Sequence, residues 1–135
     1  MPGYSGTPLP KKLGIKDGFH ICFSGAPGSV IAELRAAVAG CKVVRDGRGP
    51  LDFAMVFAKS SAELKKEFSR FTKVLAPAGM IWVSWPKKSS GVATDLDENV
   101  VREIGLGAGL VDVKVCAVTE VWSGLKFVRR VKDRR

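Results

Sequence analysis

Residues 19–39 read FHICFSGAPGSVIAELRAAVA, and this segment indicates the class of fold. Its first residues, Phe19–Phe23, form a short apolar run that predicts a buried strand. The run ends in the glycine turn Ser24–Gly28. After the turn, apolar residues recur at spacings of three and four, which predicts a helix over 29–39 with Ser29 capping its first turn. A strand, a glycine turn and a helix in this order indicate an α/β fold.

The rest of the chain continues this alternation of strands and helices. Short apolar runs predict three more strands, at 41–45, 51–58 and 80–85. Two more helices begin at the Ser60/Glu63 capping box and at the acidic stretch 94–98. Alternating apolar and polar residues at 111–117, followed by the run 125–130, predict a hairpin. We therefore predict a three-layer, Rossmann-like α/β sandwich whose mostly parallel sheet ends in a C-terminal antiparallel hairpin.

The chain of 135 residues is predicted to hold one domain. We place this α/β domain at 19–131, after an extended N-terminal arm at 1–18 that is rich in glycine and proline, and before a basic C-terminal tail at 132–135. The formal net charge is +9, from 22 basic and 13 acidic residues. Most of the excess lies in 1–18 and 126–135, so the charge describes the two ends more than the core.

Several classes of protein are excluded by composition. The three cysteines, at 22, 41 and 116, have no spacing typical of a disulfide framework or a metal site, so no metal is expected. No stretch of the sequence holds the roughly 20 apolar residues that a membrane-spanning helix needs. We expect a cytoplasmic protein with no membrane partner.

The order of elements and one loop phrase resemble the class I S-adenosylmethionine methyltransferases. The phrase LAPAGMIWV at 75–83 is similar to the Leu-Lys-Pro-Gly-Gly that precedes a strand in those enzymes. The resemblance spans 19–131 and implies a methyltransferase-like fold with the spatial strand order 2-1-3-4-6-5. One strand and helix of the full methyltransferase sheet are absent, because the connection between 41–45 and 51–58 is too short for a crossover helix.

Three longer phrases are similar to a bacterial family defined as a domain of unknown function. They are GYSGTPLPKKLGIK at 3–16, WPKKSSGVATD at 85–95, and GLVDVKVCAV at 109–118 followed by WSGLK at 122–126. This resemblance implies a bacterial origin and supplies no activity.

The methyltransferase resemblance also implies a cofactor site at the glycine turn. Gly25, Ala26 and Gly28 would form the loop against S-adenosylmethionine, and Asp46 would bind the ribose hydroxyls. The turn lacks the acidic residue and the third glycine of the family pattern, and Pro27 removes an N–H donor. Asp46 also fits a plain Asp-Gly turn. We therefore expect no cofactor, with S-adenosylmethionine kept as the alternative.

A second candidate site is the polar loop after the strand at 80–85. Lys87, Lys88, Ser89 and Ser90 offer two cations and two hydroxyls that suit a small anionic ligand. The same composition is typical of a solvated loop before a helix, and this alternative stays open.

No convergent acid, base or nucleophile is visible, so no catalytic residue is predicted. The sequence favours a noncatalytic binding or regulatory module on a methyltransferase-like fold. The first alternative is an S-adenosylmethionine-dependent methyltransferase. The second is a weak, nonspecific nucleic-acid binder that uses the basic ends. The free edge of the C-terminal hairpin also predicts a homodimer.

Overall fold

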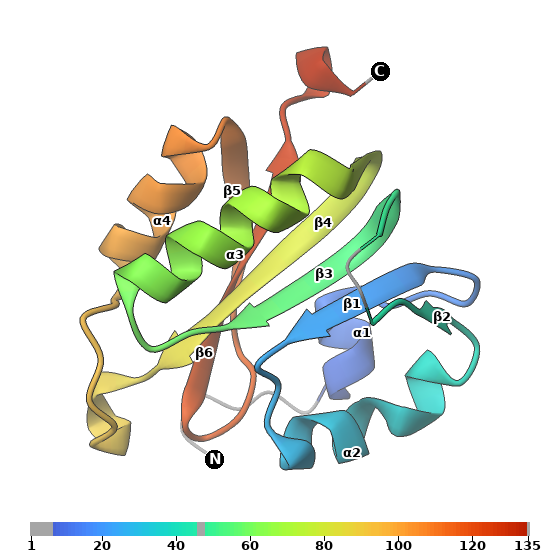
Figure 1. Cartoon of the computed structure of the whole chain (residues 1–135). Coiled ribbons are helices and arrows are strands. Elements are labelled where there is room, and N and C mark those ends of the chain that lie inside the picture. The colour runs from blue at the N-terminus through green and yellow to red at the C-terminus, as the bar shows by residue number, and fades with distance from the viewer. Residues whose placement is uncertain (1–6, 46–47, 135) are drawn as a thin grey trace.

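A six-stranded sheet forms the centre of the computed structural model, which describes residues 7–45 and 48–134 (Figure 1). Its strands are β1 (His20–Ser24), β2 (Lys42–Val43), β3 (Leu51–Phe57), β4 (Leu75–Pro86), β5 (Leu110–Ala117) and β6 (Trp122–Arg129). Their spatial order is β2-β1-β3-β4-β6-β5, as predicted. The first four strands pair in parallel, and β6 pairs antiparallel with both β4 and β5. The predicted α/β architecture with a C-terminal antiparallel hairpin is confirmed.

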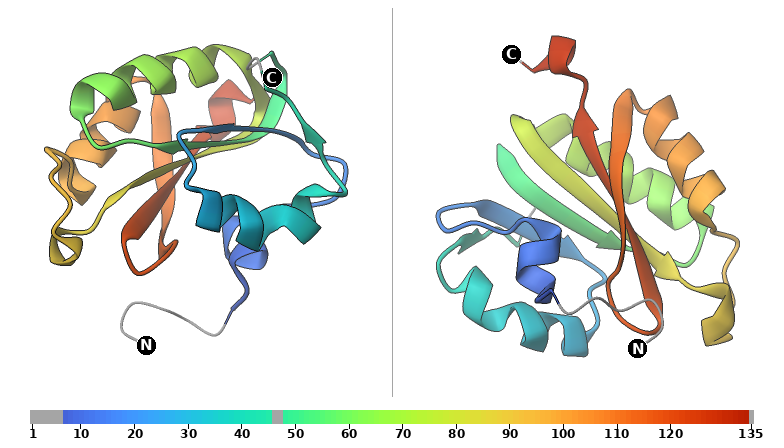
Figure 2. Two further views of the ribbon diagram at one scale, coloured as in Figure 1. Left: turned by 60° about the horizontal axis from the view of Figure 1, so that its bottom comes forward. Right: turned by 180° about the vertical axis from the view of Figure 1, so that it is seen from behind.

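Helices cover both faces of the sheet, which makes three layers (Figures 1 and 2). They are α1 (Leu9–Leu13), α2 (Gly28–Val38), α3 (Ser61–Val74) and α4 (Glu98–Gly107), with short 3-10 turns at Lys88–Ser90 and Val131–Asp133. α1 and α2 pack on one face, and α3 and α4 pack on the other. No helix among the described residues has the length and apolarity to span a bilayer.

Each face of the sheet has its own apolar core, because successive side chains of a strand point to opposite sides. On β4, Trp82 lies in the core under α1 and α2, whereas Trp85 lies in the core under α3 and α4. β3 is buried along almost its whole length and contributes to both cores. Such strands are typical of a parallel sheet covered on both faces.

Local capping chemistry fixes where two of the helices begin. Ser60 accepts a hydrogen bond from the backbone N–H of Glu63 at 3.2 Å, so the predicted cap of α3 is confirmed. The fourth helix begins later than its acidic stretch suggested, because the carboxylate of Asp97 accepts from the N–H of Val100 at 2.9 Å. The predicted Ser29 cap is wrong. α2 begins one residue earlier, with Pro27 at its N-cap and no side-chain cap.

The N-terminal segment differs from the predicted extended arm, because it contains α1. Leu13 of this short helix is fully buried, and its carbonyl accepts a 2.9 Å hydrogen bond from the indole N–H of Trp82. An isolated helix of this length is unstable in water, so α1 forms because it packs on the sheet. The segment is therefore part of the core under α1 and α2.

The outer strand of the hairpin side, β5, forms one edge of the sheet. Val113 and Val115 on this strand are about half exposed. The sheet therefore has the exposed edge strand through which the predicted homodimer would pair, and the homodimer itself stays a prediction.

Candidate functional site at the carboxyl ends of the parallel strands

The sheet reverses its strand order around β1. The chain leaves β1 through α2 to reach β2 on one side, and then crosses to β3 on the other side of β1. Open α/β sheets bind ligands outside the carboxyl ends of their strands at such a switch point. The carboxyl end of β1 is Ser24, and the predicted turn Gly25, Ala26 and Gly28 follows it at this edge. The structure therefore places these three predicted residues together at the switch point.

Gly25 holds the turn against the end of β3. Its φ angle is +70°, a left-handed conformation that favours glycine. A Cβ atom here would stand 2.8 Å from the carbonyl oxygen of Phe57, which is backbone and cannot rotate away. A side chain at this position would force the turn off the sheet.

The start of α2 presents backbone donors at the same edge. Val30 and Ile31 donate to the carbonyl of Pro27, each at 3.1 Å. The N–H groups of Gly28 and Ser29 precede these bonds and have no carbonyl behind them in the helix. Gly28 and Ser29 are both exposed, and a Cβ atom added at Gly28 would meet no other atom within 4 Å. The helix start is therefore open to an acceptor from solvent or a ligand. Asp46, the predicted ribose ligand, lies outside the described residues.

A carboxylate that sequence reasoning missed reaches this edge from α3. The hydroxyl of Ser24 donates to Glu67 Oε1 at 2.6 Å, and Arg70 donates to the same carboxylate through Nε and Nη2 at 3.0 and 3.1 Å. The hydrogen bonds from Arg70 and then Ser24 lower the pKa of Glu67 below its ordinary value. The turn has no acidic residue of its own, yet the ionised carboxylate of Glu67 contacts Ser24, the residue directly before the turn.

Glu67→Gln is expected to cost about 1 kcal/mol of stability at neutral pH, since it removes a charge-assisted contact to Arg70 whose own side chain is partly exposed. The lowered pKa of Glu67 means that its stabilisation is present above the ordinary glutamate pKa and is lost as the pH falls through the folded value. Urea unfolding of both proteins at neutral and at strongly acidic pH measures this. The stability gap should close in acid, and a gap that is constant with pH would contradict the assignment.

An aromatic pair covers the neighbouring strand ends. The rings of Phe57 on β3 and Trp122 on β6 meet edge to face, with centroids 5.1 Å apart. In the sheet, Ser84 of β4 stands opposite Phe57 of β3 and Gly124 of β6, whereas Trp122 stands opposite Pro86. Its hydroxyl is buried and has no hydrogen-bond partner among the described residues. Trp122 thus packs under the hairpin turn, against the carboxyl ends of β3 and β4.

The predicted anion loop follows β4 at the same edge. Its residues form the 3-10 turn Lys88–Ser90, and Lys87 N–H donates to the carbonyl of Val121 at 2.8 Å, which ties the loop to the hairpin. The Ser90 hydroxyl donates to the carbonyl of Lys87 at 2.6 Å and accepts from Val92 N–H at 3.2 Å. Lys88 and Ser89 are exposed. Anion binding by Lys87, Lys88, Ser89 and Ser90 stays a prediction.

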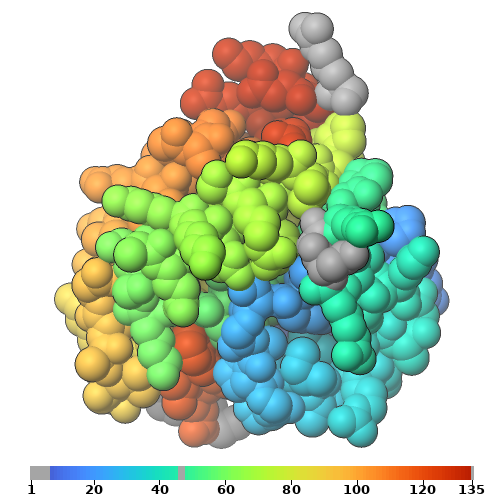
Figure 3. Space-filling model, viewed as in Figure 1, coloured from blue at the N-terminus to red at the C-terminus, as the bar shows by residue number. Residues whose placement is uncertain are grey.

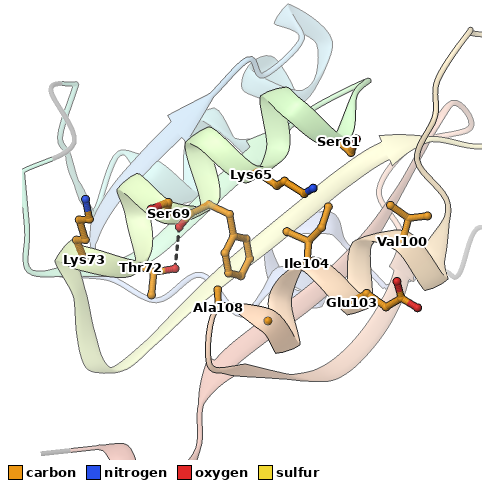
Figure 4. A pocket seen from close by; sticks show the side chains of 11 residues that line it. Ser61, Lys65, Ser69, Thr72, Lys73, Val100, Glu103, Ile104 and Ala108 are labelled. Carbon is orange, nitrogen blue, oxygen red and sulfur yellow. Dashed lines mark hydrogen bonds between the residues drawn. The ribbon is translucent and has the colours of Figure 1, made fainter.

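A hollow outside this edge lies between α3 and α4. It has a volume of about 700 Å³ and an apolar wall that includes Phe68, Val100 and Ile104 (Figure 4). Lys65, Lys73 and Glu103 are among its polar lining residues. Figure 3 shows this face of the molecule, with α3 crossing it beside α4. The groove is about the size of a small-molecule site, and no sequence pattern predicted it.

Comparisons with known proteins give the fold and no family membership. No family model matches the chain, and no curated protein matches it either. Among solved structures, the chain is similar to magnesium protoporphyrin IX methyltransferase from Synechocystis with bound SAH, at 14% identity and a TM-score of 0.60 over 90% of this chain and 78% of that one. It is also similar to precorrin-6y C5,15-methyltransferase from Geobacter metallireducens, at 12% identity and a TM-score of 0.60 over 90% and 86% of the two chains.

A third similar structure is the TehB-like SAM-dependent methyltransferase from Corynebacterium glutamicum, at 8% identity and a TM-score of 0.59 over 95% of this chain and 90% of that chain. The TM-scores of these three structures establish a shared methyltransferase-like fold, and at identities of 8% to 14% the similarity shows the fold alone. The prediction of a noncatalytic binding or regulatory module is corrected by these comparisons, because the similar solved structures are methyltransferases. That prediction gave most weight to the incomplete glycine turn. The chain has a methyltransferase-like Rossmann fold.

Proposed function

We propose that this protein binds S-adenosylmethionine at the carboxyl edge of its sheet and transfers the methyl group to an acceptor. One observation carries the proposal: the turn Gly25–Gly28 leads into the uncapped start of α2 at the switch point of the sheet. Structures with the same fold include one with bound SAH and one in complex with SAM. Both the position and the exposed donors of the turn support a ligand there.

The residues around the turn fit the polar groups of such a ligand. The N–H groups of Gly28 and Ser29 would donate to a carboxylate or hydroxyl, aided by the positive end of the α2 dipole. Glu67, kept ionised by Arg70 and Ser24, would attract the ammonium group of the ligand's methionine part. The bare backbone at Gly25 keeps the turn close to β3. Asp46 remains the sequence-based prediction for the ribose.

The bound cofactor would supply an electrophilic methyl group on a sulfonium sulfur. The chain's own part is then to hold the donor and the acceptor in line and to exclude water, and positioning of this kind accounts for large rate gains without an acid or base. The apolar lining by Phe57 and Trp122 beside the strand ends suits water exclusion.

Isothermal titration of the full chain with S-adenosylhomocysteine tests the proposal. We expect saturable binding in the micromolar range with one site per chain, and weaker binding of adenosine, which lacks the groups that Glu67 and the α2 start would hold. No heat and no stabilisation against thermal unfolding at millimolar ligand would overturn the proposal.

A further inference from the structure

Lysines from the N-terminal segment and from the C-terminal hairpin meet on the sheet face that carries α1. A cavity of about 410 Å³ lies between α1 and β5, lined by Thr7, Lys11, Lys12, Lys114, Val115, Cys116 and Ala117. Figure 2 shows α1 in front of the sheet when the molecule is seen from behind. Nothing in the proposed methyl transfer uses these residues.

Hydrogen bonds to backbone carbonyls hold two of the ammonium groups in place. Lys12 donates from Nζ to the carbonyl of Ala117 at 3.0 Å, although only 9% of Lys12 is exposed. Lys114 donates from Nζ to the carbonyl of Lys12 at 2.9 Å. A lysine ammonium has three donors, so Lys114 keeps donor capacity beyond the bond that fixes it. A buried lysine is uncommon in proteins, and here it is built into the wall of a cavity.

The register of the β5–β6 hairpin places Lys126 next to Lys114. Lys114 stands directly opposite Lys126 in the ladder between β5 and β6. Like charges at directly opposed positions of an antiparallel pair destabilise the sheet. Burial lowers the pKa of Lys126, and the nearby charges of Lys114 and Lys16 lower it further. The protein thus holds several cations close together at a cost to its own stability.

We infer that this lysine cavity, formed by Lys11, Lys12 and Lys114 with Lys126 beside them, binds a phosphate-bearing small molecule. Several converging cations call for a ligand with more than one negative charge, which a phosphate ester or a diphosphate provides and a single carboxylate does not. The volume lies within the range of small-molecule sites. The inference about this cavity does not depend on whether the chain transfers methyl groups.

Titration of the full chain with inorganic pyrophosphate at physiological ionic strength, followed by calorimetry and by thermal unfolding, tests the inference. The double variant Lys114→Gln/Lys126→Gln should bind pyrophosphate at least about tenfold more weakly than the parent. Without ligand it should melt no lower than the parent, because the opposed charges are gone. The control Lys65→Gln/Lys66→Gln removes the same charge from exposed positions of α3 and should keep parent affinity.

Three results would overturn the inference. The first is no pyrophosphate binding by the parent protein. The second is equal weakening in the α3 control, which would reflect only the net charge of the chain. The third is unchanged binding in Lys114→Gln/Lys126→Gln together with a lower melting temperature, because the two lysines would then serve only to hold α1 on the sheet. The pyrophosphate titration contains no S-adenosylhomocysteine. Its result therefore does not depend on whether the protein transfers methyl groups.

Discussion

Gly105→Ala is expected to destabilise the folded state by about 3 kcal/mol. Gly105 is the point where α4 lies on β6, and a Cβ atom there would overlap the ring of Phe127. That ring is fully buried and meets Phe68 of α3 edge to face at 5.3 Å. Because the ring is held from the other side, α4 itself would have to move away from the sheet.

Gly107→Ala is the matched control for this variant. It lies on the same helix, and an added Cβ would meet nothing within 4 Å. Alanine there should be neutral or stabilising by up to about 1 kcal/mol, since it restricts the unfolded chain. Urea unfolding followed by tryptophan fluorescence measures both. Similar stabilities for the two variants would show that α4 does not pack through Gly105.

Gly28→Glu is expected to weaken binding of S-adenosylhomocysteine by about a hundredfold or more. The new side chain would stand in open space at the first turn of α2 and would occupy the donors that the ligand needs. The fold should be unaffected, because a carboxylate at a helix start interacts favourably with the helix dipole. Calorimetry measures the loss of affinity for S-adenosylhomocysteine, and thermal unfolding of the same sample shows whether the stability of the fold is unchanged.

Ala32→Glu controls for the added charge. Ala32 is exposed one turn farther along α2, so the variant has the same net charge and leaves the helix start open. It should bind the ligand about as well as the parent protein. If both variants lose binding equally, or neither does, the ligand does not contact the start of α2.

Most of the strands and helices could be predicted from the sequence because they follow from short-range signals, namely apolar runs, glycine turns and caps. The order β2-β1-β3-β4-β6-β5 depends on contacts between distant strands, and it was expected only from the resemblance to class I S-adenosylmethionine methyltransferases. α1 could not be predicted, because its stability comes from burial of Leu13 and from the Trp82 bond, which join positions far apart in the chain.

The residues of the candidate site also separate into those that local sequence signals predicted and those that depend on distant contacts. The turn at Gly25 and Gly28 is a local feature and was predicted. Glu67 was missed, since its contact with Ser24 spans 43 residues and depends on how α3 lies across β1. The Lys114 and Lys126 pair was missed because it depends on the hairpin register, which includes an irregularity between Asp112 and Lys114.

The function prediction failed for a different reason. The noncatalytic interpretation compared the turn with the family pattern residue by residue, and counted the missing acid and glycine against catalysis. In the proposed site a carboxylate from another element, Glu67 of α3, would supply the acid that the turn lacks, and its contact with Ser24 could not be read from the residues of the turn. Fold similarity to methyltransferases then gave information that the local pattern did not contain.

Amide NMR of the full chain during titration with S-adenosylhomocysteine distinguishes a cofactor site at the carboxyl edge of the sheet from one in the groove between α3 and α4, because it reports both binding and the residues where the ligand binds. The amide signals of Gly25, Gly28 and Ser29 are expected to shift saturably, with those of the groove between α3 and α4 unchanged. The absence of shifts, or saturable shifts confined to Val100, Ile104 and their neighbours in that groove, would contradict a cofactor site at the carboxyl edge of the sheet.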